Sequence, residues 1–194
     1  MARQSKYSTE LRERALHLRA QNSPSRMPPT EDSANLARAA YHEAGHVIIR
    51  HHHGLRTPSV MIRPDGTGVT FAGGGIVNDL DIRLDVCLAG YAAESVSYKD
   101  TLFPLVKRFI TALRRLVDKD PDSAWDDYVA CVEMAVAEHP HWDDEEILQE
   151  MLDSHARVTG VLKHRWNDAQ RLATALLAAP DLHLTEHEIL AAIS

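Results

Sequence analysis

The sequence has little of what a membrane or secreted protein needs. No apolar run approaches the ~20 residues that a helix requires to cross a bilayer. The N-terminal stretch MARQSKYSTELRERALHLRAQ carries charges throughout, in place of the apolar centre of a secretory signal. Only two cysteines occur, each within an apolar stretch (LDVCLAGYAA and DDYVACVEMA), which is typical of buried, reduced thiols. These absences predict a cytoplasmic protein with no membrane partner.

An excess of positive charge is also missing. The 194 residues include 21 Lys and Arg against 28 Asp and Glu, a formal net charge of −7. Because nucleic-acid binding depends on clustered cations that neutralise phosphates, this balance argues against a nucleic-acid partner. With 44% hydrophobic residues, a chain of this length has enough apolar material for one domain with an appended arm.

The pattern of residues divides the chain into an N-terminal arm, residues 1–32, and a globular body, residues 33–194. In the arm, residues 7–20 predict a short helix, and the polar run QNSPSRMPPTEDS, with three prolines, predicts a linker. We interpret the arm as a mobile segment or one that docks on a partner.

The body is predicted to be mainly α-helical with a small β-hairpin or sheet, an α+β fold. A helix is predicted over ANLARAAYHEAGHVIIRHHH, with Asp32 or Ser33 as its N-cap and Gly54 as its C-terminal cap. The stretches SVMIRP and TGVTF alternate apolar and polar residues around a PDGTG turn, which predicts the hairpin. Further helices are predicted at 79–97, 102–118, 122–138, 143–164 and 167–178, and a last turn or two after Thr185.

The stretch YHEAGHVII, within the first of these helices, carries the chemistry. Residues four apart lie on one face of a helix, so His42 and His46 can offer two imidazole nitrogens to one ion. Glu43 lies beside them and can take a proton from a metal-bound water. This HExxH spacing predicts a zinc site that hydrolyses peptide or amide bonds. The apolar neighbours favour that interpretation over a chance match, because histidines that face a core need partners.

Two other runs contain metal-binding residue types but are interpreted differently. His51, His52 and His53 follow at the end of the same helix, cannot all share the face of the HExxH pair, and are predicted to lie at the surface. The acidic start of HWDDEEILQEMLDSH is predicted to open a helix, where negative charges lie near the positive end of the helix dipole.

Three segments, AYHEAGHVIIRH, RTPSVMIRPDGTGVTF and LDVCLAGYAAESV, resemble in order and spacing the peptidase domain of the FtsH family of ATP-dependent zinc proteases. The resemblance covers roughly residues 35–190. The glycine within the zinc motif, the proline and glycine turn after a strand, and the Gly-x-Ala-Ala-Glu helix carry it jointly. It implies a zincin-like helical domain with a small sheet that acts as a zinc metallopeptidase.

The resemblance also implies a third metal ligand. That family usually takes it from the aspartate of an Asn-Asp pair at the start of a later helix. The best match is SAWDDYVACVEMA, which implies Asp126 as the ligand, with Trp125 in place of the asparagine. A carboxylate at a helix start can reach a metal and leave a fourth position for water. Asp127, one residue along, and Glu94, in the Ala-Ala-Glu helix, are the alternatives.

The sequence departs from the family in two respects. The surplus segment FPLVKRFITALRRLV predicts an extra amphipathic helix, whose wide apolar stripe indicates core packing, with a homo-oligomer interface as the alternative. The family's ATPase module, with its GxxxxGK[ST] loop, and its membrane segments are absent from the sequence. We therefore expect cleavage of peptides or flexible protein segments without ATP, or a separate ATPase partner that delivers substrate.

The predicted function is a zinc-dependent, ATP-independent endopeptidase. The alternative is a catalytically weak, zinc-stabilised binding or regulatory module whose arm engages a partner. Glu43 favours the enzyme, because a purely structural metal site has no use for a general base. The number of protein ligands separates the two, since structural zinc usually has four and catalytic zinc leaves one position open.

Overall fold

The computed structural model describes residues 32–74, 77–98, 107–112 and 126–194. Within these, residues 32–98 and 154–194 belong to one compact unit, and residues 107–112 and 126–153 to another. The predicted arm, except for its last residue, and most of the predicted helix at 102–118 lie outside the described residues, although residues 107–112 are helical. The predicted body therefore contributes residues to both units.

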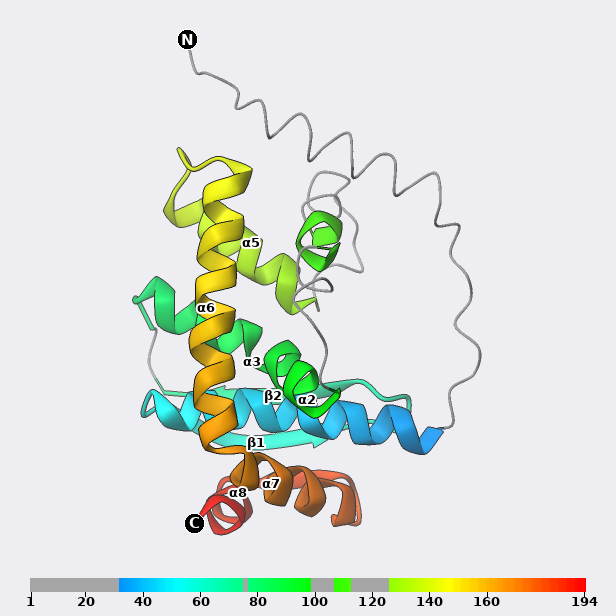
Figure 1. The fold of residues 1–194 in the computed structure, drawn as a ribbon. Coiled ribbons are helices and arrows are strands. Elements are labelled where there is room, and N and C mark those ends of the chain that lie inside the picture. The colour runs from blue at the N-terminus through cyan, green and yellow to red at the C-terminus, as the bar shows by residue number, and fades with distance from the viewer. Residues whose placement is uncertain (1–31, 75–76, 99–106, 113–125) are drawn as a thin grey trace. The chain divides into compact units, whose positions relative to one another are not determined.

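The unit that carries the HExxH segment is mainly helical with one small sheet, which confirms the predicted α+β class. Its elements are α2 (Asp32–His52), β1 (Arg56–Ile62), β2 (Gly68–Gly73), α3 (Leu80–Tyr98), α7 (Trp166–Ala178), β3 (His183–Thr185) and α8 (Glu186–Ile193). Figure 1 shows α2 running alongside β1 and β2, and α7 and α8 contact β1 and β3. The last residues of α6 (Asp144–His164), from Ser154 onward, complete this unit.

Helix α2 ends where the sequence predicts. Gly54 has a φ of 69°, in the left-handed region that glycine adopts without strain. The Leu55 N–H donates to the Arg50 carbonyl at 2.8 Å, and the Gly54 N–H donates to the His51 carbonyl at 3.1 Å. These two bonds satisfy carbonyls at the helix end in a Schellman motif, which confirms the predicted C-terminal cap.

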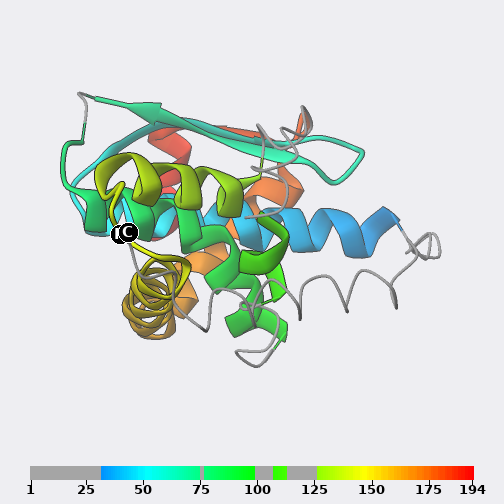
Figure 2. The same cartoon turned by 90° about the horizontal axis from the view of Figure 1, so that it is seen from above.

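The sheet has the strand order β2-β1-β3, with both pairs antiparallel. Figure 2 shows the hairpin of β1 and β2 along one side of α2. The predicted hairpin is confirmed as β1 and β2, whereas the short β3 was not predicted. Val60, Ile62 and Leu184 are buried on the face that packs into the core. Strand β2 thus lies at one edge of the sheet, and α2 contacts both β1 and β2.

Close packing between α2 and α3 brings the two chemistry-bearing helices together. A Cβ at Gly45 would meet the backbone carbonyl oxygen of Ala89 and would lie 2.7 Å from the Cβ of Ala93. At position 45 of the HExxH motif, where α2 crosses α3, only glycine therefore fits. Around it lies a core formed by buried residues of α2, α3, the end of α6, α7, α8 and the strands, which includes Ile48, Val60, Ala92, Leu162, Leu172 and Leu176.

The other unit contains α5 (Asp127–Glu138) and the first part of α6. The Asp143 carboxylate accepts the N–H groups of Glu145 and Glu146 at 2.9 and 3.0 Å, and the Glu146 carboxylate accepts the Asp143 N–H at 2.8 Å. This reciprocal cap explains why the helix begins here. The acidic run opens a helix, as predicted.

Candidate metal centre

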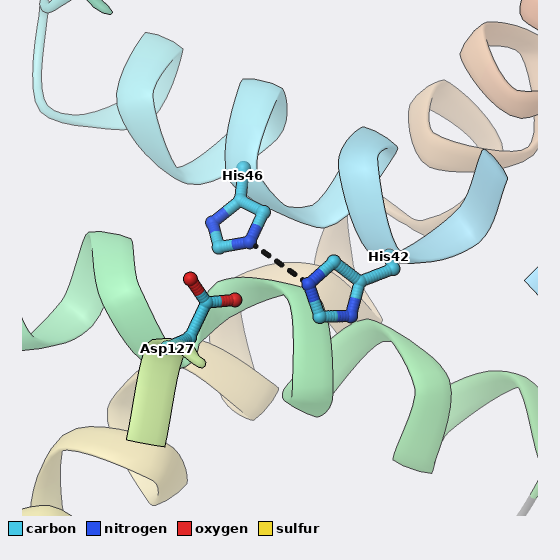
Figure 3. Close-up of side chains that lie close together, drawn as sticks. All are labelled: His42, His46 and Asp127. Atoms are coloured by element: carbon cyan, nitrogen blue, oxygen red, sulfur yellow. Dashed lines mark hydrogen bonds between the residues drawn. The ribbon is translucent and has the colours of Figure 1, made fainter. Parts of the chain in front are cut away.

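The two histidines of the motif face each other from successive turns of α2. The Nε2 atoms of His42 and His46 lie 3.1 Å apart (Figure 3). His46 is 9% exposed, and the side chain of His42 is 18% exposed. Two nitrogens that share a tetrahedral zinc, at Zn–N distances of about 2.0–2.1 Å, lie about 3.3 Å apart. The predicted pairing of His42 and His46 thus has the spacing that a shared ion requires.

The other nitrogen of each ring is already engaged by α3. His46 Nδ1 lies 2.7 Å from the Val86 carbonyl oxygen, and His42 Nδ1 lies 2.8 Å from Glu94 Oε1. A carbonyl oxygen can only accept, and so can an ionised carboxylate, so each Nδ1 carries the hydrogen and donates it. In a neutral imidazole the remaining nitrogen is then a bare acceptor. The two Nε2 atoms lie within hydrogen-bond distance of each other, a contact that either a proton on one ring or a cation shared by both rings can occupy.

Glu94 is held in its ionised form. Arg38 donates to Glu94 Oε2 through Nε at 2.8 Å and through a terminal nitrogen at 2.5 Å. Burial raises the pKa of the Glu94 carboxyl, but the hydrogen bonds and charges of His42 and Arg38 outweigh it, so the pKa lies below its ordinary value. Its place is thus behind His42, where a carboxylate fixes the ring of a metal ligand. The expectation that Glu94 could itself be the third ligand has no support in this arrangement.

The third carboxylate near the histidines is that of Asp127, at the start of α5. One ligand atom from each of His42, His46 and Asp127 lies within 4.8 Å of the others (Figure 3). Among the described residues this is the one group of three or more His, Cys, Asp or Glu side chains that could hold a metal ion.

Asp126, the predicted ligand, is instead placed as the N-cap of α5. Its Oδ1 accepts the N–H of Tyr128 at 3.0 Å. A residue at the N-cap directs its side chain back to the backbone N–H groups of the first turn. In an Asp-Asp pair at a helix start, this preference favours the first carboxylate as the cap. The second carboxylate is then available to bind a metal. That signal was present in the sequence and favours Asp127, the alternative, over Asp126.

Glu43, the predicted general base, is 4% exposed and lies against β2. The Thr70 hydroxyl donates to Glu43 Oε2 at 2.7 Å. A Cβ at Gly68 would lie 2.5 Å from Glu43 Oε1 and 2.6 Å from its Cγ. The carboxylate is therefore confined by the edge strand, in a contact that the sequence did not predict.

A second glycine makes room for the His42 ring itself. A Cβ at Gly90, on α3, would meet Nε2 of His42 and would lie 2.5 Å from both carbons that flank this nitrogen. The Tyr91 ring packs edge-on against the same imidazole, with ring centroids 5.1 Å apart. The segment Gly-Tyr-Ala-Ala-Glu thus gives the His42 ring room at Gly90, an aromatic contact at Tyr91 and a hydrogen-bond acceptor at Glu94.

The three histidines at the end of α2 and the two cysteines follow the prediction in part. His51 and His52 are exposed, whereas His53 is half-buried, with its Nε2 3.3 Å from Asp85 Oδ2. Neither cysteine forms a disulfide within the described residues; Cys131 is buried, and Cys87 is only partly so. None of these five residues belongs to the candidate metal centre found in the described part of the chain.

No protein-family model matches the chain, and no curated protein matches it. Within the described ranges, no helix combines the length and the apolar character needed to cross a membrane.

Proposed function

We propose that this protein is a zinc-dependent peptidase with a zincin-like catalytic domain of the FtsH type. His42, His46 and Asp127 hold the metal, and Glu43 is the general base. The observation that carries the proposal is the pair of Nε2 atoms 3.1 Å apart, each on a ring whose Nδ1 already donates to another acceptor. Both Nε2 atoms are thus directed at one place beside α2, as two nitrogen ligands of one ion are.

The ligand types favour zinc. Two imidazole nitrogens and one carboxylate are a common zinc set, and three protein ligands leave a fourth position for water. The same set also accepts other divalent first-row metals, so the choice in the cell depends on availability as well. We propose zinc because the spacing of the nitrogens suits a tetrahedral ion.

The chemistry divides between the metal and the side chains. When bound, zinc lowers the pKa of its water to about 7 and polarises the substrate carbonyl. Glu43 takes the proton of that water at its carboxylate and passes it to the leaving amine. Glu94, itself held by Arg38, keeps the Nδ1 hydrogen on His42 and so keeps Nε2 available as a ligand.

The substrate and partners follow from the same proposal. The sequence contains no GxxxxGK[ST] loop, so we propose that the domain cleaves peptides or flexible protein segments without ATP. Substrate delivery by a separate ATPase, a homo-oligomeric assembly and a cytoplasmic location stay predictions.

A zinc-stabilised binding module is the second candidate. It shares the metal ligands but needs no general base, whereas Glu43 is buried and held by a hydroxyl beside the site. A fourth protein ligand at the metal would support the module, because catalytic zinc keeps an open position.

The test measures zinc content and cleavage of casein or a quenched fluorescent peptide, with untagged protein. Wild type, His46→Ala, Asp127→Asn and Glu43→Gln are compared. Asp126→Ser is the matched control, because serine preserves the N-cap of α5 and removes the neighbouring carboxylate. We expect zinc in wild type, Glu43→Gln and Asp126→Ser, its loss in the other two, and no cleavage by Glu43→Gln.

The outcomes separate the assignments. Loss of zinc in Asp126→Ser but not in Asp127→Asn would restore Asp126 as the ligand. Zinc binding without any cleavage by wild type would move the conclusion to the binding module. A wild type that binds no zinc at all would refute the proposed metal centre.

A further inference from the structure

We infer that Thr70 is a positioning residue for the general base: its hydroxyl, on the edge strand β2, fixes the Glu43 carboxylate in its working orientation. The inference rests on the proposed function, because it gives Glu43 the role of the base. It adds a second element to the catalytic apparatus, since the base would depend on the sheet as well as on the helix that carries it.

The first observation is the hydrogen bond that the buried Glu43 carboxylate accepts. It is 4% exposed, and a buried carboxylate is costly unless it accepts hydrogen bonds. The Thr70 hydroxyl lies 2.7 Å from Oε2, and the same hydroxyl lies 3.4 Å from the Glu43 backbone carbonyl. A hydroxyl has a single hydrogen to donate, and the shorter distance assigns it to the carboxylate.

The second observation is independent of that bond. Gly68 lies two residues before Thr70 and therefore faces the same side of β2. A Cβ there would lie 2.5 Å from Oε1, 2.6 Å from Cγ and 2.8 Å from Cδ of Glu43. One oxygen is thus held by a hydroxyl and the other is packed against a residue without a side chain. Both restraints come from one strand and act on one carboxylate.

Register explains why these two positions face α2. Thr70 pairs with Val60, and Gly68 pairs with Ile62, whose side chains are both buried in the core. Residues directly opposite in an antiparallel pair point to the same face. The buried side chains of β1 therefore fix which face of β2 meets Glu43, and a shift of one residue would turn Thr70 away.

The orientation of a base matters because proton transfer depends on distance. A displacement of about 1 Å at a catalytic group can cost about 100-fold in rate. A carboxylate on a side chain with three rotatable bonds needs outside restraints to keep one orientation. Thr70 and Gly68 supply them without contact with substrate in our proposal.

The experiment compares Thr70→Val, which keeps the shape and removes the hydroxyl, with Thr70→Ser, which keeps the hydroxyl. Gly68→Ala perturbs the same carboxylate without changing Thr70. Each variant is assayed for zinc content, thermal melting, kcat and KM on a fluorescent peptide, and affinity for a peptide hydroxamate. A hydroxamate chelates zinc and donates a hydrogen bond to the base, so its affinity reports on Glu43 without turnover.

We expect Thr70→Val to keep its zinc and its KM, and to lose about 10- to 100-fold in kcat. Thr70→Ser should retain most of the wild-type kcat, and Gly68→Ala should behave like Thr70→Val. Hydroxamate affinity should fall in Thr70→Val. It should fall no further when Thr70→Val is added to Glu43→Gln, because coupled residues act as a unit.

Three results would overturn the inference. The first is a kcat and hydroxamate affinity of Thr70→Val equal to those of wild type. The second is an equal loss of hydroxamate affinity in the Thr70→Val variant with and without Glu43→Gln, which would mean general damage. The third is a loss of zinc, which would place Thr70 in the support of the metal.

Failure of the proposed function would give results that differ from those that overturn the role of Thr70. A wild type that binds zinc and the hydroxamate but cleaves nothing would refute the peptidase, and the double-mutant comparison would still decide whether Thr70 acts through Glu43. A wild type that binds neither would refute both.

Discussion

Gly90→Ala is a test in which the intrinsic helix propensity of α3 should rise while the affinity for zinc falls. Glycine inside a helix costs about 1 kcal/mol relative to alanine, so Gly90→Ala on a bare helix would be stabilising. In this protein the added Cβ would meet His42 Nε2 and would lie 2.5 Å from the adjoining carbons, where ordinary contacts begin at 3.4 Å. The imidazole or α3 must therefore shift by roughly 1 Å, judged against the usual carbon contact distance.

A shift of that size is large for a metal site. Ligand distances have to be right within about 0.2 Å, so a displaced Nε2 no longer meets the ion with the other ligands. We expect Gly90→Ala to weaken zinc binding at least as much as loss of an outer hydrogen bond does, which is about 10- to 100-fold. Overpacking of this kind also costs typically about 1–3 kcal/mol, which would cancel or exceed the gain in helix propensity.

The matched control is Gly160→Ala in α6. It lies within a helix, and a Cβ there would meet nothing within 4 Å. It should gain up to about 1 kcal/mol of stability and leave zinc affinity unchanged. Zinc affinity is measured by competition with a chromophoric chelator, and stability of the metal-free proteins by urea unfolding. Wild-type zinc affinity in Gly90→Ala would refute the placement of His42 against α3.

Three further predictions concern the contacts of Glu94, Gly45 and Glu188. Glu94→Gln should fold and should weaken zinc binding about 10- to 100-fold, because the hydrogen bond behind a ligand histidine loses its charged acceptor; chelator competition measures this, and unchanged affinity would contradict it. Gly45→Ala should cost about 1–3 kcal/mol in urea unfolding, since its Cβ would strike the backbone of α3; a neutral result would show that the helices can separate freely. Glu188→Ala should lower the melting temperature near neutral pH. Hydrogen bonds from the Thr185 backbone and hydroxyl lower the pKa of Glu188, so its stabilisation is present above the ordinary glutamate pKa and is lost as pH falls through the lowered value. The two melting curves should therefore converge in acid, and a constant gap would contradict the assignment.

Much of the fold could be predicted because its signals are local. The end of α2 depends on Gly54, and the start of α6 depends on Asp143 and Glu146, all within a few residues of the feature that they fix. The hairpin likewise follows from alternation around a short turn. Strand β3 could not be predicted, because three residues carry no periodic pattern and the pairing of Leu184 with Val60 spans most of the chain.

The site was predictable only as far as helical spacing reaches. A separation of four residues already places His42 beside His46. What lies behind and across from them depends on packing: the engagement of Nδ1 by Val86 and Glu94, and of Glu43 by Thr70, comes from segments far away in the sequence. Family resemblance led to Asp126 as a ligand, whereas capping chemistry would have favoured Asp127.

The position of the histidines on α2 has a consequence for the stability of the newly synthesised protein, before any substrate binds. The helix that would bind the metal is also the one against which α3, α7 and two strands pack, so an ion bound to the native state stabilises the whole unit. At a free zinc concentration about 100 times the dissociation constant, that linkage amounts to about 2.7 kcal/mol. A newly made chain that finds no metal would unfold more often and be degraded sooner, and zinc supply would thereby set the amount of protein as well as its activity.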